Sequence, residues 1–280
     1  MPRRERADIL LTDSGLAESR SAAQRLIMAG QVRADGERVL RSAQRLDRSA
    51  KLTLDEAPRF VSRGGDKLAA ALDSMPIQIV GRVCADIGAS TGGFTDCLLQ
   101  AGAARVYAVD VGQGILHWRL RNDPRVQVME GINARYLTAL AEPVSVVTLD
   151  LSFISLRLIL PQLPGWMEPA GDVVALVKPQ FEVGKQAVGR GGVVRDEAER
   201  LRALQAVAES AREQGLQPQA ALRSPLLGPK GNVEFLLWAR RGGRLLDLEQ
   251  VLAGARLAPE GESRDNSGIL PVAGGQTPAP

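Results

Sequence analysis

Two charged residues stand where apolar, strand-like runs of the chain end. Asp150 follows the run 144–149, and Lys178 follows the run 173–177. In an open parallel sheet the carboxyl ends of the strands line the ligand crevice, so we expect both side chains to lie there. A carboxylate and an amine that face one crevice can pair and can handle a proton. This spacing predicts an active site at that edge of the sheet.

A glycine-rich turn over residues 88–94 lies upstream of this pair and follows the apolar run 82–87. Glycines before a helix let a ligand approach the backbone closely. Asp110 lies 22 residues after Gly88, close to the spacing at which an acid holds ribose hydroxyls. Because Ser90 replaces the second glycine of the dinucleotide pattern, the turn alone is compatible with NAD, with S-adenosylmethionine or with no ligand.

The elements that must position these residues alternate along the chain. Strands are predicted at 82–87, 105–110, 125–129, 144–149, 171–177, 218–223 and 233–239. Helical segments between them predict an α/β fold with a doubly wound, Rossmann-like sheet. The last of the seven strands is expected to be antiparallel, the layout of S-adenosylmethionine methyltransferases, and to bring Glu234 to the same crevice. A dehydrogenase would need a further substrate-binding segment, for which few residues remain.

The bulk composition is that of a folded globular chain. Its 280 residues are 45% hydrophobic and 24% charged, with no apolar run near the roughly 18 residues of a membrane span. No signal region follows the N-terminus, so we expect a cytoplasmic protein. Cys84 and Cys97 fall in or beside predicted buried elements and indicate reduced thiols. The single histidine, His117, argues against a histidine triad or a zinc site, and no metal is expected.

The N-terminal segment differs from the rest in charge and pattern. Residues 1–60 hold 12 basic and 9 acidic residues, which leaves 23 of each in the remainder. This small surplus is weak support for a polyanionic partner such as nucleic acid. Two short helices, the second with a capping box at Ser21, and a few short strands predict a small α+β domain.

Five separated motifs resemble those of the TlyA family, which comprises haemolysin-named ribosomal RNA 2′-O-methyltransferases with an FtsJ/RrmJ-type catalytic domain. The motifs are Ser62–Leu68, Asp86–Thr95, Asp150–Ser155, Val177–Glu182 and Gly231–Glu234. The segment 19–36 is similar to the RNA-binding domain of ribosomal small-subunit protein four. The expected boundaries are 4–56 for an RNA-binding domain, 57–62 for a linker, 63–242 for the methyltransferase domain and 261–280 for a disordered tail.

The resemblance implies a catalytic set at Lys67, Asp150, Lys178 and Glu234. A ribose 2′-hydroxyl is a poor nucleophile until its proton is removed, and a neutral lysine amine can accept that proton. Methyl transfer from a sulfonium donor is an in-line displacement that depends mainly on positioning. We favour Lys178 as the base, although the sequence does not decide between the two lysines, and Asp150 could instead cap a helix.

The resemblance also implies the binding residues. For S-adenosyl-L-methionine they are Asp86, Gly88, Ala89, Ser90, Gly92, Gly93, Phe94, Asp110 and Asn133. For structured RNA they are Arg6, Arg20, Arg25 and Arg33, although each single arginine could equally be a solvated surface charge.

The leading hypothesis is an S-adenosylmethionine-dependent ribose methyltransferase that acts on ribosomal RNA or ribosomal subunits. The resemblance implies cytidine in 23S and, in some members, 16S rRNA as the target. A noncatalytic RNA-binding or ribosome-assembly factor is an alternative, which the intact catalytic set disfavours. A membrane-active haemolysin is the third, for which the sequence shows neither a spanning segment nor a strongly basic amphipathic helix.

Overall fold

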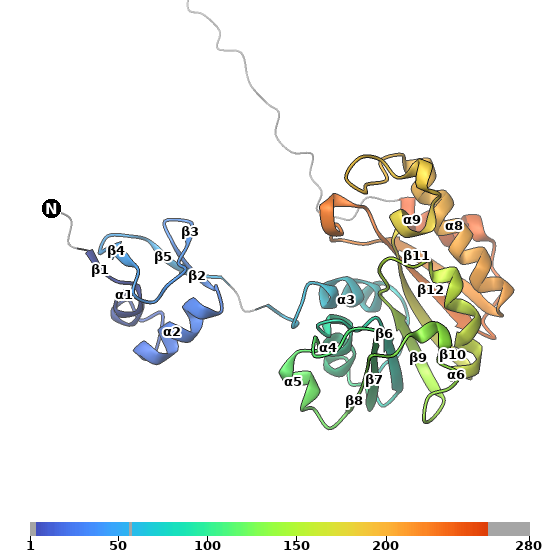
Figure 1. The fold of residues 1–280 in the computed structure, drawn as a ribbon, viewed down its shortest axis with the longest axis horizontal. Helices are drawn as coiled ribbons and strands as arrows, with labels where there is room; N and C mark the ends of the chain where they lie inside the picture. Colours follow the sequence, from blue (N-terminus) through green and yellow to red (C-terminus); the bar gives the residue numbers. More distant parts are fainter. Residues whose placement is uncertain (1–3, 56–57, 257–280) are drawn as a thin grey trace, which may run out of the picture. The chain divides into compact units, whose positions relative to one another are not determined.

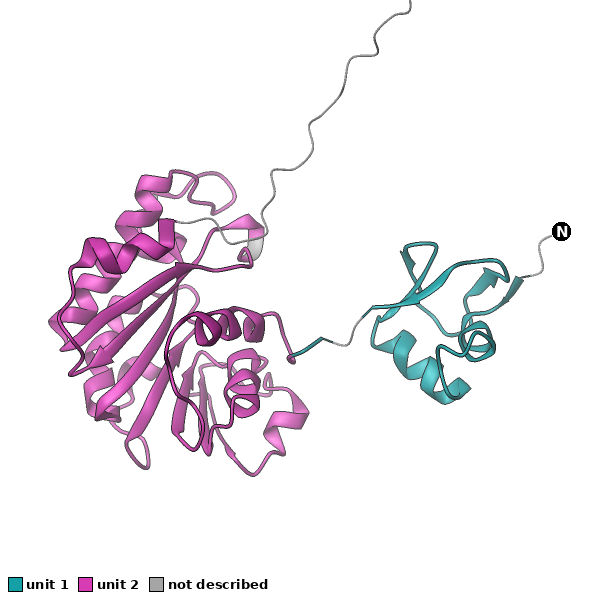
Figure 2. Cartoon of the chain, turned by 180° about the vertical axis from the view of Figure 1, so that it is seen from behind, with its two compact units in different colours: residues 1–59 teal, residues 60–280 magenta. Residues whose placement is uncertain are grey.

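The computed structural model describes residues 4–55 and 58–256. The chain divides into two compact units, Met1–Arg59 and Phe60–Pro280, which Figure 2 colours separately. Each unit buries a hydrophobic core of its own, as independent domains do. The tail predicted to be disordered, 261–280, lies outside the described residues.

The small unit consists of short helices and strands around one core. Its elements are β1 (Arg4–Arg6), α1 (Ala7–Asp13), α2 (Arg20–Met28), β2 (Val32–Ala34), β3 (Glu37–Arg38), β4 (Arg45–Asp47) and β5 (Leu52–Leu54). β1 pairs with β4, and β2 lies between β3 and β5. The capping box expected at Ser21 is wrong by two residues, because the Ser19 hydroxyl accepts the Ala22 N–H at 3.2 Å and starts α2 at Arg20.

The large unit is built on a seven-stranded sheet in the order β11-β12-β10-β9-β6-β7-β8 (Figure 1). The strands are β6 (Val83–Ile87), β7 (Arg105–Asp110), β8 (Val126–Glu130), β9 (Val144–Leu149), β10 (Met167–Val177), β11 (Leu216–Arg223) and β12 (Phe235–Arg241). β12 is antiparallel to both of its neighbours, and all other pairs are parallel. The expected methyltransferase layout with an antiparallel last strand is confirmed.

Helices cover both faces of this sheet. They are α3 (Gly64–Ser74), α4 (Gly93–Gln100), α5 (Trp118–Arg121), α6 (Leu163–Trp166), α7 (Pro179–Glu182), α8 (Glu197–Glu213) and α9 (Leu248–Arg256). Apolar side chains of α3, α4 and α5 form one buried cluster with the sheet, and those of α6, α8 and α9 form the other. The result is a three-layer α/β unit whose strand ends stay open to ligands. Within the described residues, no helix is both long enough and apolar enough to cross a membrane.

The large unit extends beyond both boundaries expected from the sequence. At its start Phe60 is buried against Gly65, where a Cβ would lie only 2.2 Å from the ring. The Val61 N–H donates to Asp96 at 2.9 Å, so these residues pack onto the unit and do not act as linker. At the other end α9 follows residue 242 and packs against β11 through its apolar face.

Candidate active site

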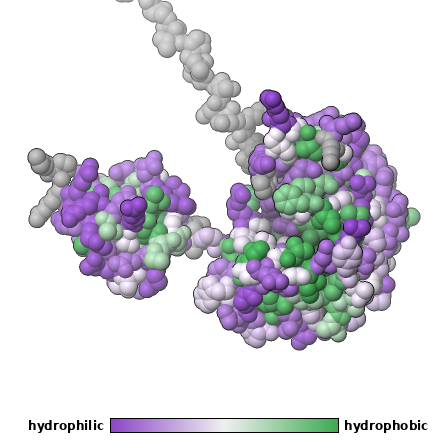
Figure 3. Space-filling view, in the orientation of Figure 1, coloured by the Kyte–Doolittle hydropathy of each residue, from purple (hydrophilic) through white to green (hydrophobic). Residues whose placement is uncertain are grey.

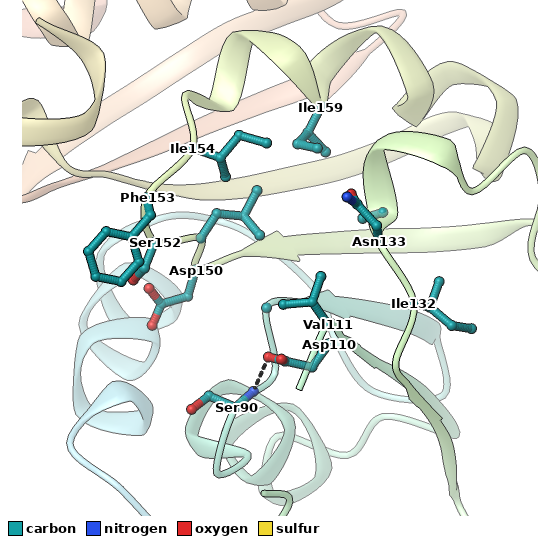
Figure 4. Close-up of a pocket in the computed structure, with 13 residues that line it drawn as sticks. Ser90, Asp110, Val111, Ile132, Asn133, Asp150, Ser152, Phe153, Ile154 and Ile159 are labelled. Carbon is teal, nitrogen blue, oxygen red and sulfur yellow. Dashed lines mark hydrogen bonds between the residues drawn. The ribbon is translucent and has the colours of Figure 1, made fainter. Parts of the chain in front are cut away.

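The carboxyl ends of the parallel strands border two adjoining cavities of about 380 and 340 Å³. Gly88, Ser90 and Asp150 line both, so the two cavities form one cleft. The larger part, shown in Figure 4, is also lined by Asp110, Val111, Ile132, Asn133, Ala134, Leu151, Ser152, Phe153, Ile154 and Ile159. The smaller part is also lined by Ser62, Arg63, Gly64, Lys67, Ala89, Thr91, Gly93, Phe94 and Lys178.

The glycine turn is fixed in the cleft by hydrogen bonds and by one close backbone contact. Gly88 has a φ of +84°, and a Cβ there would lie 2.5 Å from the Asp150 carbonyl oxygen, so only glycine fits. The Asp110 carboxylate accepts the Ser90 N–H at 2.8 Å and the Gly112 N–H at 2.7 Å. Asp110 therefore holds two loops at the cleft while its side chain lines the cavity (Figure 4).

Two of the residues predicted to contact a cofactor support the turn from beneath it. The Asp86 carboxylate is fully buried and accepts the hydroxyls of Thr95 at 2.6 Å and Thr148 at 3.0 Å. Burial raises the pKa of Asp86 to about 7. Gly92 has a φ of +97°, and a Cβ there would meet Leu120 at 2.2 Å. Neither residue lines the cleft.

Glycines at the starts of α3 and α4 explain how Lys67 reaches the cleft. The starts of α3 and α4 touch, since a Cβ on Gly93 would lie 2.3 Å from the Ser62 hydroxyl and 2.9 Å from the Gly65 nitrogen. This close approach lays the first turn of α3 beside the glycine turn, and Lys67 lines the smaller part of the cleft. Gly65, Gly92 and Gly93 are thus packing requirements of the site, whereas a Cβ on Gly64 would make only ordinary contacts.

The structure brings the four predicted catalytic residues together as two ion pairs. The Lys67 Nζ lies 2.6 Å from Glu234 Oε2, and the Lys178 Nζ lies 2.6 Å from Asp150 Oδ1. Lys178 also donates to the Ser152 hydroxyl at 3.0 Å. Both lysines and Glu234 are buried, and burying such charges is tolerable only because they are paired.

The antiparallel last strand explains this meeting. Val177 at the end of β10 pairs with Phe235 at the start of β12. The adjacent residues Lys178 and Glu234 therefore lie side by side at the same edge of the sheet. Glu234 precedes the strand that was predicted to contain it and belongs to the loop before β12.

A glycine in that loop was not predicted to matter for the site. A Cβ on Gly228 would lie 2.0 Å from Glu234 Oε1 and 2.6 Å from its carboxyl carbon. This oxygen is buried and has no hydrogen-bond partner in the described part of the chain. Gly228 is thus the space that admits the Glu234 carboxylate, and no pattern in the sequence marks this contact.

A further cavity of about 380 Å³, here called the aromatic cavity, is lined by Lys178 and shares Ser152 and Phe153 with the larger part of the cleft. Phe153 and Phe181 line it, with their ring centres 5.2 Å apart. Phe153 has a φ of 64° and is 92% exposed, unusual for a phenylalanine. The buried Glu182 carboxylate fixes the loop that carries Phe153 by accepting the Leu156 N–H at 2.8 Å. Sequence analysis missed this surface, although both phenylalanines lie in the quoted motifs.

The four arginines predicted to contact RNA all lie in the small unit: Arg6, Arg20, Arg25 and Arg33. Arg6 and Arg20 lie against the buried carboxylate of Asp8. Arg25 is exposed on α2, and Arg33 pairs with Asp55 at 2.8 Å. Three of the four are therefore already held by acids of the same unit.

Comparison with known proteins agrees with this architecture. Residues 60–241 match the model for FtsJ-like methyltransferases, and residues 5–52 match the S4 domain. The chain is 51% identical to the Mycobacterium tuberculosis protein named 16S/23S rRNA (cytidine-2′-O)-methyltransferase TlyA. The alignment spans 244 residues and covers 86% of this chain and 91% of that one. The chain belongs to the TlyA family. Another relative, the Bacillus subtilis protein named as rRNA methyltransferase YqxC, is 44% identical over 259 residues, which cover 89% of this chain and 92% of that one.

A solved structure shows the same architecture over nearly the whole chain. It is a hemolysin-named protein of Streptococcus thermophilus, with a TM-score of 0.69 and 41% identity, covering 90% of this chain and 96% of that one. The expected TlyA resemblance and the two domain types are confirmed. Hemolysin-named and methyltransferase-named proteins therefore share this fold, and the site must decide between the two activities.

Proposed function

We propose that this protein transfers a methyl group from S-adenosyl-L-methionine to a ribose 2′-hydroxyl of ribosomal RNA, with cytidine as the target nucleoside. The supporting observation is that Lys178 lines both the cleft and the aromatic cavity. A donor in the cleft and a nucleoside in the aromatic cavity would meet at its amine. The TlyA relative named above carries this activity in its name.

The cleft suits the methyl donor. The turn around Gly88 offers close backbone approach for the methionine part, and Asp110 has lone pairs left for ribose hydroxyls after accepting two N–H groups. Asn133 uses its Oδ1 to accept the Arg135 N–H at 3.0 Å, which leaves its Nδ2 to donate to an adenine ring nitrogen. When bound, S-adenosylmethionine supplies the electrophilic methyl group.

The two ion pairs suit proton removal. Lys178 must first give one ammonium proton to solvent; the neutral amine then keeps two N–H bonds, which Asp150 and Ser152 can accept, and its lone pair takes the hydroxyl proton. Lys67 is held by Glu234 and lines the part of the cleft beside the turn, where its positive charge favours the developing oxyanion. The residues thus orient the nucleophile and accept its proton.

The aromatic cavity suits a nucleobase. An exposed ring such as Phe153 offers a stacking surface of the kind that single-stranded or flipped bases use. The S4 domain match supports RNA docking through the small unit. Ribosomal RNA is the expected partner, which would place the protein's action in the cytoplasm.

The function is tested with purified protein, tritiated S-adenosylmethionine and ribosomal subunits from a strain that lacks this gene. We expect label in rRNA that survives alkaline hydrolysis as one resistant dinucleotide, because a 2′-O-methyl group blocks cleavage there. Subunits from the parent strain, whose site is already modified, serve as the control and should take up little label. Equal labelling of subunits from the parent strain and from the strain that lacks the gene would contradict the proposal. Labelled products that alkali cleaves completely would contradict it as well. Binding without any transfer would favour the assembly-factor alternative.

A further inference from the structure

Asp8 of the small unit is a fully buried acid that lies beneath surface arginines. Its carboxylate accepts Arg6 Nε at 2.9 Å and Arg6 Nη2 at 2.8 Å, a two-point contact. It also accepts Arg20 Nη2 at 3.3 Å and Gln24 Nε2 at 3.0 Å. These donors hold the pKa of Asp8 well below its usual range, so the group is an anion at any physiological pH.

The guanidinium groups around Asp8 exceed it in charge. The side chains of Arg6 and Arg20 remain 35% and 56% exposed, while that of Asp8 is 0% exposed. The β1–β4 pairing also sets Arg45 directly opposite Arg6. Two like charges opposite each other on a small sheet repel. Glu5 also lies near Arg6 and Arg45 but pairs with Arg48 at 3.5 Å, so the two acids leave this surface with a positive excess. This surface, in a unit whose exterior is mostly hydrophilic in Figure 3, is suited to an anion.

Asp8 contacts only part of each guanidinium. The two-point contact occupies the Nε–Nη2 edge of Arg6, and Arg20 uses a single nitrogen. Within the described residues the other N–H groups of these side chains have no acceptor, so they can meet a phosphate, whose geometry suits planar guanidinium groups. An arginine that is already held in place loses less rotamer entropy on binding than a free one.

We propose that Asp8 is a positioning residue for RNA binding, which holds Arg6 and Arg20 as a preformed pair for one phosphate of the RNA backbone. This inference rests on the proposed function, because it requires that the small unit docks ribosomal RNA. Asp8 itself touches no RNA and acts through the two arginines.

Neutralising Asp8 separates positioning from net charge, because the two effects change RNA affinity in opposite directions. Removing a negative charge from a surface that binds a polyanion should tighten binding if only net charge matters. If Asp8 positions the arginines, its neutral variant should bind more weakly in spite of the gained positive charge. The direction of the change therefore separates positioning from charge.

The test compares full-length Asp8→Asn with Asp13→Asn, the same chemical change at an exposed position of the same helix. Binding to large ribosomal subunits from a strain lacking the gene is measured by filter retention at several salt concentrations. We expect Asp8→Asn to bind about tenfold more weakly, with a shallower dependence on salt because phosphate contacts are lost. Asp13→Asn should bind as the wild type or slightly more tightly.

A variant that already lacks both arginines serves to exclude general damage to the small unit. In the double variant Arg6→Ala, Arg20→Ala, adding Asp8→Asn should change the affinity by less than about twofold, since there is nothing left to position. A further tenfold loss in that background would indicate misfolding and would overturn the inference. Wild-type-like or tighter binding by Asp8→Asn alone would overturn it as well. If the wild-type protein itself did not bind the subunits, the proposed function would fail, and this inference with it.

Discussion

The substitution Gly228→Ala should disable catalysis without a direct change to any catalytic residue. The added Cβ would lie 2.0 Å from Glu234 Oε1, whereas real Cβ contacts essentially never fall under 3.0 Å. The backbone of Gly228, with φ −68° and ψ 177°, is open to alanine, so the effect is purely steric. The Glu234 carboxylate must therefore retreat by about 1 Å, a displacement that can cost 10²-fold in rate.

That retreat should reach the reaction through Lys67. The Lys67–Glu234 contact is 2.6 Å in a buried setting, and lengthening it leaves the amine less well held. We expect the single-turnover rate of methyl transfer to fall about 10²-fold, which is about 2.7 kcal/mol. Donor affinity measured by calorimetry should change little, because Gly228 does not line the cleft.

The control is Gly184→Ala, where a Cβ would meet nothing within 4 Å. It should be as active and as stable as the wild-type protein. A Gly228→Ala enzyme within threefold of the wild-type rate would refute the role given to the Lys67–Glu234 pair. Loss of donor binding in the same variant would show instead that the whole site had collapsed.

Three further changes probe other parts of the site. Phe153→Ala should lower kcat/KM for the RNA substrate about tenfold through lost stacking, with thermal stability nearly unchanged because the residue is 92% exposed. Asp110→Ala removes the acceptor of two loop N–H groups and should weaken donor binding at least tenfold by calorimetry. The pKa of Asp86 is about 7 in the fold against about 3.9 in the unfolded chain, so the folded state binds the proton more tightly between these values. Stability should decline as pH rises from about 4 to 7, and Asp86→Asn should flatten that decline in thermal unfolding.

Local patterns were enough to predict the sheet. The predicted strands 105–110 and 144–149 coincide with β7 and β9, since short apolar runs bounded by charges and turns leave few alternatives. The helix α9 was missed because its nine residues (Leu248–Arg256) are stabilised by packing on β11, which its own sequence does not reveal. Phe60 was assigned to a linker because its partner, Gly65, is recognisable only in the packed structure.

The site was predictable where it depends on strand ends and unpredictable where it depends on tertiary contact. Asp150, Lys178 and Glu234 come together because strand direction alone places them at one edge. The burial of Asp86 could not be predicted, because an acid before a glycine turn can face either the ligand or the core. The exposure of Phe153 contradicts the usual preference of phenylalanine for the interior, so no hydrophobicity pattern could mark it.

The proposed mechanism requires the Lys178 amine to accept the ribose proton. The single-turnover rate of Lys178→Ala, with donor and ribosomal subunits both saturating, measures this requirement. We predict a loss of 10² to 10⁴-fold, the range that a general base supplies, while the affinities for donor and subunits stay within about twofold of wild type. Transfer within tenfold of the wild-type rate, with both ligands bound, would contradict the claim.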